Sequence, residues 1–252
     1  MRRNAASETD IESKRADLAL VDRNFFKSRA KAQEAIAAGL VRVNGKILRK
    51  PSEPIGSSAQ IEAMAPYPWV SRGGVKLAAA LNAFGFDPNG LVCLDIGAST
   101  GGFTHVLLSR GAAEVVAVDV GHGQLHPDIA RDPRVKSHEG TDARSLTRAA
   151  LASAPRLVTC DVSFISLALV LPAVLPFAAE NAGLVALIKP QFEAGPGHVV
   201  KGVVKDAEIR RKVCADVETL ISGLGWRVVG LLPSPIEGGD GNREYLIGAR
   251  RA

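Results

Sequence analysis

The sequence predicts an α/β protein with a Rossmann-like, doubly wound and mostly parallel sheet, preceded by a small α+β domain. Strands buried on both faces read as continuous apolar runs, and four such runs alternate with amphipathic segments, at 91–96, 115–120, 157–160 and 184–188. A glycine-rich turn directly follows the first run. Two further strands are expected at 226–232 and 244–248, the second antiparallel to the first.

The N-terminal part is basic. Residues 1–65 hold 12 of the 31 Lys and Arg residues but 8 of the 26 Asp and Glu residues, and between Lys14 and Lys50 the balance is 10 to 3. Such an excess is typical of a module that contacts a phosphate backbone, although a solvated basic face is about as frequent on charge alone. We assign residues 1–65 to this domain, with a flexible tail at its start, and residues 66–70 to a linker.

Local signals predict a helix followed by a hairpin in this domain. Ser28 is suited to cap a helix over 29–38, and Gly39 to end it. Asn44 and Gly45 separate two short apolar runs and tolerate the positive φ angles of a tight hairpin turn. The arrangement leaves eight basic residues for the surface, which we expect to contact RNA: Arg23, Lys27, Arg29, Lys31, Arg42, Lys46, Arg49 and Lys50.

The domain over 71–252 is expected to bind a nucleotide-like cofactor beyond the carboxyl ends of its strands. The glycine turn has the spacing Gly-x-x-x-Gly-Gly, which misses the dinucleotide pattern. Acidic residues before the turn and after the next strands suit the amino acid, ribose and adenine parts of S-adenosylmethionine, with Asp142 equally suited to be a helix N-cap. The predicted cofactor-binding residues are Asp95, Gly97, Ala98, Ser99, Gly101, Gly102, Asp119 and Asp142.

Two resemblances add to this interpretation. The pattern from Ser28 to Gly45 resembles the αL-type RNA-binding motif of a small-subunit ribosomal protein and of pseudouridine synthases. The glycine turn, together with segments 71–77, 160–166, 188–193 and 241–246, resembles the TlyA family. That family is similar to FtsJ-like methyltransferases, which implies a Rossmann-like methyltransferase domain and 2′-O-methylation of cytidine in ribosomal RNA. Its older label is hemolysin.

Lys76, Asp161, Lys189 and Glu244 are the predicted catalytic residues. A ribose hydroxyl is a weak nucleophile, so transfer of a methyl group to it requires a positioned base. A lysine amine accepts a proton only when neutral, and burial or a second nearby cation favours that form. Our hypothesis makes Lys189 the base, oriented by Asp161, with Lys76 as the nearby cation and with Lys76 and Glu244 positioning the ribose.

The segment 193–201 after Lys189 is expected to form an irregular, substrate-facing flap, and Arg72 and Lys201 are further candidates for phosphate contacts. The scattered Cys93, Cys160 and Cys214 provide neither a disulfide framework nor a paired zinc spacing, so no metal is expected. The sequence predicts a cytoplasmic protein with no membrane segment and with ribosomal RNA or ribosomal subunits as partner. It leaves the oligomeric state open.

Three other functions remain compatible with parts of the sequence. The methyl acceptor can be a protein or a small molecule, which leaves the basic domain unexplained. A non-catalytic ribosome-assembly factor would bind RNA without needing a cofactor. A membrane-active hemolysin requires a spanning or broadly apolar amphipathic helix, and the longest apolar stretch, 167–179, is interrupted by Pro172 and Pro176.

Overall fold

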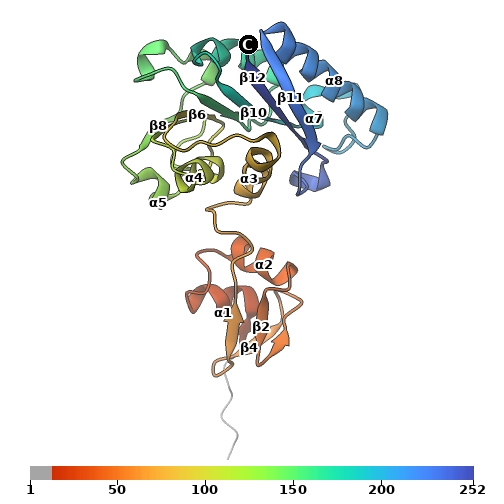
Figure 1. Cartoon of the computed structure of the whole chain (residues 1–252). Helices are drawn as coiled ribbons and strands as arrows, with labels where there is room; N and C mark the ends of the chain where they lie inside the picture. The colour runs from red at the N-terminus through yellow and green to blue at the C-terminus, as the bar shows by residue number, and fades with distance from the viewer. Residues whose placement is uncertain (1–12) are drawn as a thin grey trace, which may run out of the picture. The chain divides into compact units, whose positions relative to one another are not determined.

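The structure is a computed structural model in which residues 13–252 are described, so the predicted N-terminal tail lies outside the described part. The chain divides into two compact units, the first ending at Pro68 and the second beginning at Trp69 (Figure 1). Each unit has its own buried apolar core. We describe the units separately.

The N-terminal unit packs two helices on short strands. Its helices are α1 (Ala16–Asp22) and α2 (Arg29–Ala37). Its strands are β1 (Ser13–Arg15), β2 (Val41–Val43), β3 (Lys46–Ile47), β4 (Pro54–Gly56) and β5 (Ile61–Ala63). They form a three-stranded sheet in the order β3-β2-β5 and a two-stranded sheet of β1 and β4. Leu20, Ile36, Val41 and Ile55 lie in the core between helices and strands.

The predicted helix and hairpin of this unit are confirmed. The Ser28 hydroxyl accepts a hydrogen bond from the Lys31 backbone N–H and so caps α2. Asn44 and Gly45 join β2 to β3 with φ angles of 51° and 78°. Strands β1, β4 and β5 have no counterpart in the sequence-based prediction, because each has only three residues and too little periodicity to be recognised.

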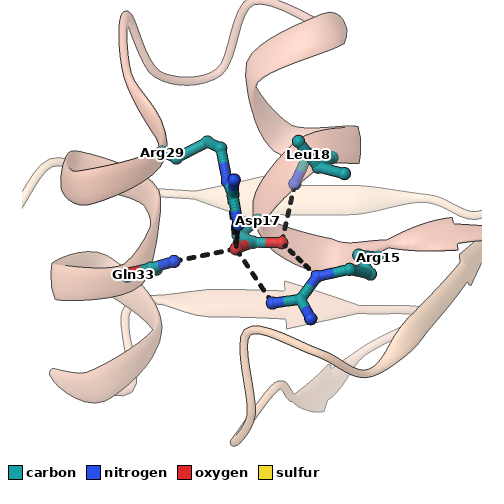
Figure 2. Close-up of polar contacts among 5 residues, drawn as sticks. All are labelled: Arg15, Asp17, Leu18, Arg29 and Gln33. Atoms are coloured by element: carbon teal, nitrogen blue, oxygen red, sulfur yellow. Dashed lines mark hydrogen bonds and ion pairs between the residues drawn. The ribbon is translucent and has the colours of Figure 1, made fainter.

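A buried carboxylate joins α1 to α2 (Figure 2). The side chain of Asp17 is fully buried and accepts hydrogen bonds from the Arg15, Arg29 and Gln33 side chains, the last two from α2, at 2.8–3.3 Å. It also accepts the Leu18 backbone N–H at 3.1 Å. The Arg15 guanidinium is the largest cause that holds the pKa of Asp17 well below its usual range. The two helices are therefore linked by a charge that stays ionised.

The C-terminal unit contains a seven-stranded sheet in the order β11-β12-β10-β9-β6-β7-β8. From β10 to β8 each strand is parallel to its neighbour, whereas β12 is antiparallel to both β10 and β11. The strands are β6 (Val92–Ile96), β7 (Glu114–Asp119), β8 (Val135–Glu139), β9 (Leu157–Cys160), β10 (Gly183–Ile188), β11 (Trp226–Pro233) and β12 (Tyr245–Arg251). The predicted doubly wound, mostly parallel sheet is confirmed.

Helices cover both faces of this sheet (Figure 1). One face packs against α3 (Gly73–Phe84), α4 (Gly102–Ser109) and α5 (Pro127–Ala130), whose apolar residues share a core cluster with β6, β7 and β10. The opposite face packs against α6 (Leu167–Val174) and α8 (Ala207–Gly223). A short helix, α7 (Pro190–Glu193), follows β10. One predicted boundary is wrong: Glu244 precedes β12 instead of opening it.

The Asp17 network predicts a pH-dependent N-terminal unit. Because the folded-state pKa lies below the unfolded value of about 4, the stabilisation by ionised Asp17 is present above pH ~4 and is lost as the pH falls further. Asp17→Asn should therefore lower the protection of α1 and α2 amides from hydrogen exchange at pH 7. It should also flatten the pH dependence of that protection below 4. Asp22→Asn, at an exposed aspartate paired with Lys14, is the matched control and should change neither.

Candidate functional site

Strand register brings the predicted site residues to one edge of the sheet. Gly97 follows β6, Asp161 follows β9 and Lys189 follows β10, while Glu244 precedes the antiparallel β12. The last paired residues are Ile96 with Cys160, Ala186 with Cys160, and Ile188 with Tyr245. Lys189 and Glu244 are thus the next residues along two neighbouring strands. Predicted site residues next to four adjacent strands therefore meet at the edge where the parallel strands end.

Two lysine–carboxylate pairs form at this edge. The Lys189 Nζ lies 2.7 Å from the Asp161 Oδ1 and donates a hydrogen bond to the Ser163 Oγ at 2.7 Å. The Lys76 Nζ, from α3, donates to the Glu244 Oε2 at 2.5 Å. The Lys76 and Glu244 side chains are 8% and 3% exposed, against 11% and 19% for Lys189 and Asp161. The Lys189–Asp161 pair is therefore more accessible to solvent than the Lys76–Glu244 pair.

The Lys76–Glu244 pair adds detail to the catalytic hypothesis. Removing one member of a buried ion pair is costly because the other charge is left without compensation, so Lys76 and Glu244 depend on each other. Lys76 therefore has a carboxylate partner, and its effect on Lys189 stays a prediction. Its contribution is to hold Glu244, and with it the start of β12, against α3.

A cleft of about 440 Å³ opens at the same edge, beyond the ends of β6 and β7. Gly97, Ser99, Asp119, Asp142 and Asp161 line it, together with apolar side chains. Gly97 has a φ of +81°, and a Cβ there would lie 2.4 Å from the Asp161 carbonyl oxygen. Only glycine allows the turn after β6 to pass so close to the end of β9.

The other residues of the glycine turn serve its geometry. Gly101 has a φ of +89° and its N–H donates to the Ala98 carbonyl at 2.7 Å, which closes the turn. A Cβ on Gly102, the first residue of α4, would lie 2.2 Å from the Ser71 Oγ. Ala98, Gly101 and Gly102 are not among the residues that line the cleft. All three residues are buried, and direct cofactor contact by them stays a prediction.

The two carboxylates after β7 and β8 have different surroundings. The Asp119 carboxylate accepts the Ser99 N–H at 2.8 Å and the Gly121 N–H at 2.7 Å, one on each oxygen. Asp142 caps the 3-10 turn Ala143–Ser145 (η1) and pairs with Arg144 at 2.6 Å. The hydrogen bond from Arg144 is the main reason that the pKa of Asp142 falls to about 2. The N-cap alternative for Asp142 is confirmed, and the residue also lines the cleft.

Asp95 does not face the cleft, so its prediction as a cofactor-contacting residue is corrected. Its side chain is fully buried and accepts hydrogen bonds from the Thr104 Oγ1 at 2.6 Å and the Thr159 Oγ1 at 2.8 Å. Burial raises the pKa of Asp95 to about 6. Because Thr104 lies on α4 and Thr159 on β9, Asp95 links the two elements that flank the glycine turn.

Phe164 is the feature of the site that the prediction missed. It lines the cleft, is 90% exposed and has a φ of +64°, which is a strained conformation for an aromatic residue. Its ring centroid lies 5.0 Å from that of Phe192, which follows Lys189 on α7. Both residues stand in the segments that carried the family resemblance, and that context was the available signal. Glu193, the first residue of the predicted flap 193–201, is the last residue of α7, and its carboxylate accepts the Ser166 hydroxyl at 2.6 Å.

The basic residues of the N-terminal unit fall into two groups. Arg23 donates to the carbonyls of Gly56, Ser57 and Ala59, and Arg29, whose side chain is 53% exposed, pairs with Asp17. Both cations therefore have partners within the unit, and RNA contact by them stays a prediction. Lys31 lies over the Tyr67 ring. The other residues that are predicted to contact RNA are exposed: Lys27, Arg42, Lys46, Arg49, Lys50, Arg72 and Lys201.

Two absences hold for the described residues. Between residues 13 and 252 no group of three or more His, Cys, Asp or Glu side chains is placed to hold a metal ion. In the same range, no helix combines the length and the apolar character needed to cross a bilayer.

A doubly wound sheet with a glycine turn after β6, a cleft beyond it and lysine–carboxylate pairs at its carboxyl edge defines the class of Rossmann-like methyltransferases. The model of the FtsJ-like methyltransferase family matches residues 69–251, and the S4 domain model matches residues 14–61. The 16S/23S rRNA (cytidine-2′-O)-methyltransferase TlyA of Mycobacterium tuberculosis is 46% identical over 94% of this chain and 89% of its own length. The chain therefore belongs to the TlyA family of FtsJ-like methyltransferases.

Other similarities agree with this family. Hemolysin A of Brachyspira hyodysenteriae is 40% identical over 88% of this chain and 93% of its own length. A solved structure of a hemolysin-like protein from Streptococcus thermophilus has a TM-score of 0.76 and 38% identity, covering 96% of this chain and 90% of that one. The N-methyltransferase NodS of Bradyrhizobium japonicum, at 15% identity and a TM-score of 0.51, shares the fold.

The environment of Asp95 predicts a distinct pH dependence of the C-terminal unit. The folded-state pKa of about 6 lies above the unfolded value of about 4, so the free energy of unfolding should rise as the pH falls from 6 to 4. Asp95→Asn keeps one oxygen that accepts a threonine hydroxyl and places an NH2 group, which can donate to the other threonine, where the second oxygen lay. Because this side chain does not titrate, the substitution should remove the rise in urea unfolding curves. Asp216→Asn, at an exposed aspartate paired with Lys212, should leave it intact. A rise that persists in Asp95→Asn would show that another group is responsible.

Proposed function

We propose that this protein transfers a methyl group from S-adenosylmethionine to the 2′-hydroxyl of a cytidine in ribosomal RNA. The observation that supports this most directly is the Lys189–Asp161 pair at the rim of the cleft, with the Lys76–Glu244 pair next to it in register. The names of the M. tuberculosis relative and of a Campylobacter jejuni relative, 38% identical, supply the substrate class. This substrate places the proposed activity in the cytoplasm.

The cleft suits S-adenosylmethionine in size and in chemistry. Its volume of about 440 Å³ lies in the range of roughly 300–1,000 Å³ that is usual for cofactor sites. Each Asp119 oxygen accepts one backbone N–H and retains a lone pair, so the carboxylate can also accept ribose hydroxyls. Gly97 lines the cleft without a side chain, and the close approach of its backbone to Asp161 brings that carboxylate's segment to the cleft. The cofactor supplies a methyl group that is activated by attachment to a sulfonium.

In the proposed reaction Lys189 is the general base. Its amine, when neutral, accepts the proton as the 2′-O–H bond breaks, while the oxygen forms a bond to the methyl carbon. The Asp161 carboxylate and the Ser163 hydroxyl fix the position of the Nζ, and Asp161 stabilises the ammonium that results. Asp161 also lines the cleft, so its charge favours the electropositive methyl group.

Lys76 and Glu244 have a positioning role in this proposal. Their buried pair links α3 to the start of β12, opposite the end of β10 that carries Lys189. The pair therefore fixes the start of β12 beside the end of β10 and so helps to position Lys189. It also places polar groups close to the proposed position of the ribose. Phe164, exposed on the cleft rim, adds an aromatic surface near the acceptor nucleoside.

The N-terminal unit is proposed to hold the RNA. Its exposed cations are carried by the β2–β3 hairpin, the segment after it and the start of α2, and Arg72 and Lys201 add charge on the C-terminal unit. Lysine and arginine side chains on a compact fold contact phosphates and read RNA shape, with little access to base edges. This unit accordingly supplies affinity, while the cleft supplies the chemistry.

The base role of Lys189 is tested by Lys189→Ala. Methyl incorporation into ribosomal RNA should fall by roughly 10²–10⁴-fold, the usual contribution of a general base. Calorimetric binding of S-adenosylmethionine should be retained, because Lys189 is not among the cleft-lining residues. Lys212→Ala, which removes an exposed lysine paired with Asp216, is the matched control and should keep full turnover. Turnover by Lys189→Ala at the control rate would exclude Lys189 as the base.

A further inference from the structure

A second polar cavity lies at the opposite edge of the same sheet. It has a volume of about 170 Å³ and is lined in part by Arg156, Leu157, Gly183 and Arg250, with Asp87. Arg156 precedes β9 and Gly183 opens β10, so this edge carries the amino ends of the parallel strands. The proposed active site lies at their carboxyl ends, and the two sites share no lining residue.

The strand register places two arginines face to face at this edge. Arg227 on β11 lies opposite Arg250 on β12, and Arg250 lies opposite Gly183 on β10. Residues directly opposite in an antiparallel pair lie on the same face, with Cβ atoms about 4.5–5.5 Å apart, and like charges in such a pair destabilise the sheet. Gly183 also pairs with Leu157 on β9, and Arg156 is the residue directly before Leu157. Arg156 therefore adds a third positive charge at this edge.

These three arginines lack carboxylate partners in the described part of the chain. No ion pair is formed there by Arg156, Arg227 or Arg250, whereas Arg134, Arg144 and Arg211 each pair with an aspartate or glutamate. The Asp87 carboxylate lines the cavity and compensates one charge in part. Positive charge therefore remains in excess at this edge.

The cavity also holds one guanidinium in a defined orientation. Arg250 lies over the Phe86 ring at 4.7 Å and donates to the Gly85 carbonyl at 3.4 Å. A Cβ on Gly183 would lie 3.0 Å from Phe86 and 3.1 Å from Leu157, so this glycine keeps the floor of the cavity open. A stacked guanidinium leaves its remaining N–H groups free in the plane that suits an oxyanion.

We propose that this cavity is a phosphate site that binds the backbone of the RNA substrate outside the active site. The proposal rests on the proposed function for the identity of the RNA. Arg156 and Asp161 flank the four residues of β9, so five steps of ~3.3 Å place them about 17 Å apart. A structured RNA whose ribose reaches the carboxyl edge can therefore extend to the amino edge and place a phosphate there.

The test measures RNA affinity against salt for the full-length protein. Arg156→Gln and Arg250→Gln should each weaken binding of a 23S rRNA transcript about three- to tenfold near 0.15 M salt. Each should also reduce the slope of log K against log salt by about one, as expected for one lost phosphate contact. Asp87→Asn, which removes the negative charge from the cavity, should strengthen binding.

Two controls separate this outcome from loss of folding. Arg211→Gln removes an arginine that pairs with Glu208 on the exposed side of α8, and it should leave affinity and slope unchanged. Calorimetric binding of S-adenosylmethionine should remain at the wild-type value in all variants. If Arg250→Gln fails to fold, Arg156→Gln still decides the question, because Arg156 is exposed and donates no side-chain hydrogen bond within residues 13–252.

A wild-type slope in folded Arg156→Gln would overturn the proposal. A second result would also overturn it: the wild-type protein binds inorganic phosphate or a mononucleotide, and the substitutions abolish that binding but leave RNA binding unchanged. The site would then bind a free phosphate compound. The affinity measurement needs no turnover. Absence of methylation by the wild-type protein, combined with the reduced slopes, would therefore count against the proposed function alone.

Discussion

The candidate site depends on the pairing of β12 with β10. This antiparallel strand lies between β10 and β11, so its first residues arrive at the edge where the parallel strands end. Glu244 reaches Lys76 only because Ile188 pairs with Tyr245, and a shift of one residue would turn alternate side chains to the other face. Two ion pairs from four distant parts of the sequence are thus placed next to each other by a single ladder of hydrogen bonds.

A second constraint acts through the backbone under the cleft. Gly97 passes close to the Asp161 carbonyl, and the Asp161 N–H donates to the Ile96 carbonyl at 2.8 Å. Below this contact the Asp95 carboxylate joins Thr104 to Thr159, at the cost of burying a charge or keeping a proton. These contacts connect the cleft wall directly to the segment that carries Asp161, which favours the fixed geometry that alignment of a nucleophile with a methyl group requires.

Patterns that depend on local chemistry could be predicted from the sequence. The buried strands, the Ser28 cap, the Asn44-Gly45 turn and the lysines and acids at strand ends were predicted because each signal is contained in a few residues. The errors concern partners that are distant in sequence. Nothing near Asp95 indicates that two threonines enclose it, and nothing near Arg23 or Arg29 shows that carbonyls and Asp17 bind them.

The two edges of the sheet differ in whether their cationic side chains are paired with carboxylates. At the carboxyl edge Lys76 and Lys189 each have a carboxylate partner, so no lysine charge is left unpaired there. At the amino edge Arg227 and Arg250 lie opposite each other without an ion pair to a carboxylate within residues 13–252, and the stacking of Arg250 on Phe86 leaves the repulsion between the two charges in place. Unfavourable local arrangements such as two opposed like charges are usually found at functional sites, where a bound ligand offsets the lost stability. Because phosphate contacts carry no base code, the choice of nucleotide must then arise from RNA shape and from the rim of the cleft, where Phe164 is exposed.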